Sequence, residues 1–160
     1  QHGEPPTVTA LVRGQGELIG LLKAAGYNMD ERTEDGRTGM HVAGMLGRAG
    51  SVRELIEAGA EAGAKDRAGK TMVHWAAEYG HVEVLRTVEE QRRKKTLNNL
   101  MLKKDSDGRT CAHYASAGGH LEVVRYVAET CGEEVLREKD NDAAVRAQGE
   151  YGRAHGGGAV

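Results

Sequence analysis

The sequence predicts an elongated all-α solenoid in which helix-turn-helix repeats stack side by side. Three copies of one nine-residue pattern, a recurring second-helix pattern and a composition dominated by small apolar residues lead to this prediction. The three copies lie at 35–43, 68–76 and 107–115. Because one helical hairpin cannot bury its apolar face alone, such repeats have to pack against their neighbours.

Each copy places a glycine and a basic residue before a threonine, and a histidine three positions after it. The threonines at 38, 71 and 110 are 33 and 39 residues apart. A threonine hydroxyl can accept a hydrogen bond from the free N–H groups at a helix start, and a side chain three positions later can reach back to the cap. The glycine permits a left-handed turn just before the helix. We therefore expect a turn followed by a capped helix at each copy, with the histidines as capping residues: His41, His74 and His113.

A second pattern follows, Gly-His-Val-Glu-Val-Leu at 80–85 and Gly-His-Leu-Glu-Val-Val at 119–124, and a Gly-Ala turn stands at 59–60. Together these motifs resemble the ankyrin-repeat family, whose unit of about 33 residues combines a Thr-Pro-Leu-His-x-Ala start with such a second helix. The resemblance implies an ankyrin-type solenoid with short β-turn or hairpin connections over residues 5–151. Its expected parts are a degenerate first repeat (5–37), two repeats (38–70 and 71–109, the latter with an insertion), a fourth (110–142), a partial last repeat (143–151) and a disordered tail (152–160).

The insertion in the second complete copy falls within 89–104. We expect it to lengthen the second helix to about Lys95 and to add a longer loop. From Arg86 to Lys104 there are seven basic and two acidic residues, a local charge of +5. Two interpretations stay open: a solvated face, or a contact of residues 92–104 with nucleic acid, an acidic partner or an anionic surface. The absence of an interleaved aromatic residue weighs against nucleic acid. The proposed basic patch is Arg92, Arg93, Lys94 and Lys95.

No motif for catalysis, cofactor binding or metal binding stands out. The sequence contains no HExxH, GxSxG or P-loop pattern, and the capping histidines recur once per repeat, which a structural role explains. Cys111 and Cys131 lack a CxxC spacing or nearby ligands, so we expect reduced thiols that pack within the repeats. We therefore expect no enzyme activity, no cofactor and no metal.

The bulk properties fit a soluble intracellular chain. Twenty-two Lys and Arg against 24 Asp and Glu give a net charge of −2, so no global field attracts nucleic acid or membranes. No apolar run is long enough for a membrane span. We expect a cytoplasmic location, with the nucleus as the alternative, and a monomer or part of a longer chain, since the sequence opens with Gln1.

The resemblance also implies a partner-binding surface along the turn tips and the exposed side of each first helix. Arginine beside aromatic and methionine side chains is typical of interface hot spots. Trp75 and Tyr114 share one position, where we expect packing. Two functions stay open, a protein-interaction module or a regulatory segment of a larger enzyme or channel. The expected binding residues are Glu34, Asp35, Arg37, Arg67, Lys70, Ser106, Asp107 and Arg109 at the tips, and Met45, Leu46, Glu78 and Tyr79 on the helices.

Overall fold

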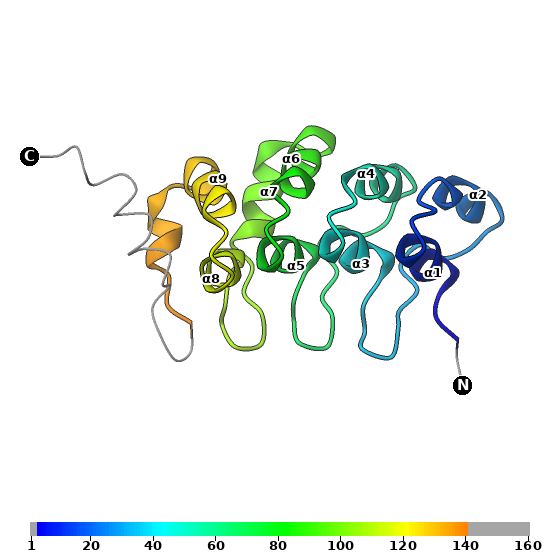
Figure 1. Cartoon of the computed structure of the whole chain (residues 1–160), viewed down its shortest axis with the longest axis horizontal. Coiled ribbons are helices and arrows are strands. Elements are labelled where there is room, and N and C mark those ends of the chain that lie inside the picture. Colours follow the sequence, from blue (N-terminus) through cyan, green and yellow to red (C-terminus); the bar gives the residue numbers. More distant parts are fainter. Residues whose placement is uncertain (1–2, 141–160) are drawn as a thin grey trace, which may run out of the picture.

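The computed structural model of this chain describes residues 3–140, in which helices form two rows with hairpins projecting from one edge (Figure 1). The all-α solenoid is confirmed. The expected partial repeat at 143–151 and the tail at 152–160 lie outside the described residues. The inner row, next to the hairpins, contains α1 (Pro6–Val12), α3 (Gly39–Met45), α5 (Met72–Glu78) and α8 (Cys111–Ala117). The outer row contains α2 (Leu18–Ala24), α4 (Ala49–Glu57), α6 (Val82–Gln91) and α9 (Leu121–Cys131).

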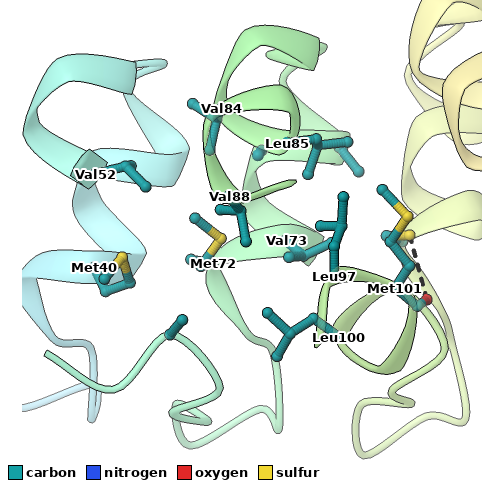
Figure 2. Packing of buried hydrophobic residues seen from close by; sticks show 14 of the residues in the cluster. Met40, Val52, Met72, Val73, Val84, Leu85, Val88, Leu97, Leu100 and Met101 are labelled. Carbon is teal, nitrogen blue, oxygen red and sulfur yellow. Dashed lines mark hydrogen bonds between the residues drawn. The ribbon is translucent and has the colours of Figure 1, made fainter. Parts of the chain in front are cut away.

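The core runs continuously along the stack rather than forming one centre. One position of the outer helices is filled by Ile19, Val52, Leu85 and Val124, and none of these side chains has any exposed surface. Fully burying such a side chain stabilises the fold by about 1.5–3 kcal/mol. Figure 2 shows how Met72 and Val73 of α5 meet residues of the neighbouring helices in this layer.

The capping role of the histidines is confirmed. The backbone N–H of Thr38 donates to Nδ1 of His41 at 3.0 Å, and the same bond forms in the other two copies. Because Nδ1 accepts this bond, the ring proton of the neutral imidazole sits on Nε2. In His41 and His74 that Nε2 lies 3.0 and 3.1 Å from the carbonyl oxygens of Lys70 and Arg109, which belong to the next copy of the nine-residue pattern. Each of these two caps therefore also ties its copy of the pattern to the next.

The insertion folds differently from the expectation of a helix lengthened to Lys95 and followed by a loop. The outer helix α6 ends at Gln91, Arg92 and Arg93 adopt extended backbone, and a separate helix α7 (Lys94–Met101) follows. On α7, Leu97 and Met101 are fully buried and Leu100 is 5% exposed. The spacing of these three residues forms an apolar stripe on one helix face. The expectation was wrong because this stripe finds a core between α6 and α9, against which α7 packs.

A smaller element of the same kind follows α9. The 3-10 helix η1 (Glu133–Arg137) buries Val135 and Leu136 against α8 and α9. Like α7, η1 therefore adds buried residues to the core.

Candidate functional site

Three hairpins of the described residues, at 33–37, 66–70 and 105–109, stand in a row beside the inner helices (Figure 1). Each hairpin is closed by a backbone bond between the residue before the tip and the basic residue after it, as from the N–H of Asp66 to the oxygen of Lys70 at 2.9 Å. Neighbouring hairpins are joined too, because the N–H of Arg67 donates to the oxygen of Asp35 at 3.2 Å and that of Ser106 to Ala68 at 3.0 Å. The row therefore holds the expected tip residues in a common register.

The tip residues differ in exposure. Five of the expected binding residues are exposed at the tips, namely Glu34, Asp35, Arg67, Ser106 and Asp107, whereas Arg37, Lys70 and Arg109 are half-buried. Two of the half-buried residues, Arg37 and Lys70, lie over the aromatic residues for which we expected packing, Trp75 and Tyr114. The third, Arg109, pairs with Asp140 at 3.3 Å.

Each of these aromatic residues is anchored by a hairpin carboxylate. One oxygen of Asp66 accepts the N–H groups of Ala68 and Lys70, and the other accepts the indole N–H of Trp75 at 2.9 Å. Asp105 repeats this arrangement with the hydroxyl of Tyr114. Burial raises the pKa of Tyr114, so its hydroxyl stays protonated and donates. The sequence reasoning missed this link, although an aspartate nine positions before the aromatic residue in two repeats was its visible signal.

Cations and aromatic rings alternate along the row. The Arg37 guanidinium lies 4.5 Å from the Trp75 ring centre, and the Lys70 ammonium lies 4.1 Å from Trp75 and 4.0 Å from Tyr114. Lys70 also pairs with Glu78 at 2.8 Å. The structure therefore brings Arg37, Lys70 and Glu78 together around Trp75 and holds them in fixed positions.

Beside this cluster lies an apolar pair. Leu46 and Tyr79 follow the ends of α3 and α5 at matching positions of adjacent repeats, and they are 41% and 50% exposed. The Tyr79 ring stacks against Trp75, with centres 6.4 Å apart and planes 13° apart. The third copy has Gly118 at this position, so the apolar pair is confined to two repeats. Met45, the other expected hot spot, is half-buried.

We call this surface the hairpin groove. It includes a hollow of about 250 Å³ between the first two hairpins and the inner helix α5. The hollow is lined by Asp35, Arg37, Asp66, Arg67, Ala68, Lys70 and Trp75. The hairpin groove comprises these residues together with Leu46, Glu78 and Tyr79.

The four expected basic residues lie elsewhere, at the junction between α6 and α7. Arg92, Arg93, Lys94 and Lys95 are all exposed there, and we call them the basic junction. They follow an outer helix, whereas the hairpin groove is built from hairpins and inner helices. The structure therefore places some of the expected binding residues in the hairpin groove and four in the basic junction, while Glu34, Met45, Ser106, Asp107 and Arg109 belong to neither surface.

Residues 3–140 also bear on the expectations for metal sites, membrane spans and reactive thiols. Within that range no three His, Cys, Asp or Glu side chains are grouped to hold a metal ion, and no helix is long and apolar enough to cross a membrane. Burial raises the pKa of Cys131 to about 11 and also raises the pKa of Cys111. Both thiols therefore stay protonated at neutral pH, which makes them poor nucleophiles.

Comparison with known proteins agrees with this architecture. A family model of ankyrin repeats in three copies matches residues 7–99, and a model of a single ankyrin repeat matches residues 107–135. The interval between them contains the end of α7.

Two kinds of relative illustrate the similarity. The chain is 33% identical over 85 residues to neurogenic locus notch homolog protein 1 of Xenopus laevis, and 35% identical over 78 residues to the E3 ubiquitin-protein ligase KEG of Arabidopsis thaliana. It is 38% identical over 69 residues to neurogenic locus notch homolog protein 2 of Homo sapiens. These matches cover 53%, 48% and 43% of this chain but only 3%, 5% and 3% of the relatives.

Proposed function

Because this chain belongs to the ankyrin-repeat family, we propose that it is a non-enzymatic, intracellular module that binds a protein partner across the hairpin groove. Ankyrin repeats are generally protein-interaction modules, and the fold here presents a rigid surface to one side. We further propose that the module acts as a monomer, either alone or within a longer chain.

The observation that carries this proposal is the exposed pair of Leu46 and Tyr79 next to the ordered charges of the hairpins. Tyrosine, tryptophan and arginine are the residues on which protein interfaces concentrate their binding energy, so Tyr79 is the expected anchor and Leu46 adds apolar contact area beside it. Here Tyr79 is supported from behind by Trp75. Its ring is therefore ordered before a partner arrives.

Preorganisation extends to the polar part of the groove. The side chain of Lys70 is only 12% exposed, since it lies between two aromatic rings and pairs with Glu78. A partner that contacts this cluster pays little side-chain entropy on binding, which is one of the main costs of association. Arg67 is exposed at the tip of the hairpin that also contains Lys70, and there it can pair with an acidic group of the partner.

Site-specific crosslinking tests the location of the interface. A photoreactive phenylalanine replaces Tyr79 in the groove, and in a second protein it replaces Glu122, an exposed residue of the outer helix α9. A protein captured from cell extract through position 79 but not through position 122 supports the proposal.

The captured protein is then purified and its affinity is measured for three chains. The wild type is compared with Leu46→Ala/Tyr79→Ala and with the control Leu21→Ala/Tyr27→Ala, which removes a leucine and a tyrosine of the first repeat that are 67% and 45% exposed. We expect the groove variant to bind at least about tenfold more weakly and the control to bind like the wild type. Equal affinity of both variants would contradict the proposal.

A second candidate function is a regulatory or targeting segment within a larger protein, including an enzyme or channel whose activity lies outside these residues. The small share of each relative that the chain covers favours it. In that case the groove would bind a segment of the same polypeptide. Crosslinks from position 79 within the full-length protein, rather than to a separate protein, would distinguish the two.

A further inference from the structure

The basic junction is a concentration of charge that the groove does not use. None of its four side chains forms an ion pair with another residue in the range 3–140. The two nearest carboxylates along the chain are engaged elsewhere, because Glu89 accepts the hydroxyl of Tyr126 and Glu90 pairs with Arg53 at 3.3 Å. The positive charge of the junction is therefore left without a local counter-charge from its own segment.

The position of these cations opposes the stability of the helix that follows them. Arg93 is the N-cap of α7 and Lys94 and Lys95 are its first residues, with no acidic residue in the first turn and no side-chain cap. The N-terminus of a helix carries a partial positive charge and favours anions, so cations there are destabilising. Residues that break a local rule without a structural gain are candidates for a binding function.

The junction is nevertheless held on a firmly packed element. The buried residues Leu97, Leu100 and Met101 fix α7 in the core, and the amide of Asn98 donates to the carbonyl of Thr130 on α9 at 3.2 Å. The cations are therefore displayed at a defined place, and their backbone runs extended at Arg92 and Arg93 before it turns into the helix.

The surroundings restrict the chemistry of a ligand. Among residues 80–101 no large hydrophobic side chain is exposed, and the nearest exposed one in sequence, Leu102, follows the opposite end of α7. The junction itself therefore offers neither an apolar anchor for a protein nor a ring on which a nucleic-acid base could stack. Four adjacent cations also cover too short a stretch for the many phosphate contacts that duplex binding uses. A compact ligand with several closely spaced negative charges fits both restrictions.

We propose that the basic junction binds a compact cluster of phosphate groups, as found in a polyphosphorylated lipid headgroup or a soluble oligophosphate. The guanidinium groups of Arg92 and Arg93 are suited to bidentate contact with phosphate oxygens. The ammonium groups of Lys94 and Lys95 add charge at the helix start, where free N–H groups also favour an anion. Charges that repel one another in the free protein are compensated when the ligand binds.

Calorimetric titration with inorganic tripolyphosphate tests this proposal on the full chain. The test variant changes Arg92, Arg93, Lys94 and Lys95 to Gln. The matched control changes the exposed cations Arg13, Lys23, Arg125 and Arg137 to Gln, which alters the net charge equally at dispersed positions. We expect the wild type and the control to bind, and the test variant to bind on the order of tenfold more weakly or not at all.

Three results would overturn the proposal: no binding to the wild type, equal weakening in both variants, or tighter binding of a single-stranded RNA oligonucleotide than of tripolyphosphate. Thermal unfolding of each variant checks that weaker binding does not come from a loss of fold. Removing cations from the start of α7 should leave the melting temperature unchanged or raise it. Flotation with phosphatidylcholine vesicles, with or without a phosphatidylinositol bisphosphate, then distinguishes a lipid headgroup from a soluble ligand. Crosslinking through position 79 is independent of this test, so either proposal can fail alone.

Discussion

Truncating Leu97 to alanine should destabilise the chain by about 2–5 kcal/mol, the cost of removing a fully buried leucine and leaving a cavity behind. Leu97 has no exposed surface, and it lies on α7 in the layer that also contains Val73 and Leu85 (Figure 2). If the insertion were instead a solvated extension of α6, the same substitution would change the free energy of unfolding by less than about 0.5 kcal/mol. The magnitude of the loss therefore decides whether α7 belongs to the core.

The assay is urea unfolding followed by tryptophan fluorescence. Trp75 is the sole tryptophan of the sequence, and it lies on α5, which contacts α7. The matched control is Asn99→Ala, an exposed position of the same helix, for which we expect a change within about 0.5 kcal/mol. Equal stabilities of the two variants would refute the packing of α7. Because repeat proteins can unfold in parts, circular dichroism is recorded alongside the fluorescence.

Three further predictions concern the caps and the hairpins. Burial lowers the pKa of the capping histidines below the ordinary value of 6.5, so below that pH the unfolded chain binds more protons than the folded one. The free energy of unfolding should therefore be highest above pH 6.5 and fall as the pH drops below it, by up to about 1.4 kcal/mol per pH unit for each histidine. Urea titration at several pH values measures this. A pH-independent stability between pH 7.5 and 5.5, above the range in which ordinary carboxylates titrate, would contradict this. Gly69→Ala should lower the free energy of unfolding by about 1–2 kcal/mol or more in the same assay, because the residue has φ +75° and a Cβ would lie 2.8 Å from the nitrogen of Ser106. The control Gly20→Ala lies in a helix with open space around it, and it should raise the free energy of unfolding by about 0.5–1 kcal/mol. Trp75→Phe should cost about 1–3 kcal/mol by circular dichroism, since it leaves one oxygen of Asp66 without its indole donor, and an unchanged stability would show that this bond contributes little.

Much of the fold follows from local pattern. The Thr-x-x-His spacing predicted three capped helix starts, and all three caps form with the expected bond. The Gly-His-x-Glu-Val pattern predicted the outer helices α6 and α9. These features were predictable because a cap, a turn glycine and an apolar stripe each act within about one helical turn, where sequence distance and spatial distance agree.

The candidate site was predicted only in part. Its tip residues and the exposed Leu46 and Tyr79 follow from the repeat register. The cluster around Trp75 does not, since its contacts join residues from three copies of the nine-residue pattern, such as Arg37 with Trp75 and Lys70 with Tyr114. Repeat spacing says that these residues recur, but not which neighbouring repeat each side chain faces.

The structure of the insertion could also be predicted only in part from the sequence. Its charge and its extra length are visible in the sequence, and Leu97, Leu100 and Met101 already have helical spacing. Whether that stripe would face water or a core depended on the space left between α6 and α9, which exists only once the repeats are stacked.

By itself, then, the sequence determined the repeat unit, its caps, its register and the all-α solenoid, because these depend on hydrogen bonds and apolar spacing within one repeat. The tertiary structure alone decided that two of the histidine caps bond to the next copy of the nine-residue pattern, that α7 joins the core, and that the basic junction lies apart from the hairpin groove. The two histidine bonds, for example, join residues 29 and 35 positions apart. Such contacts form only when stacking brings the repeats together.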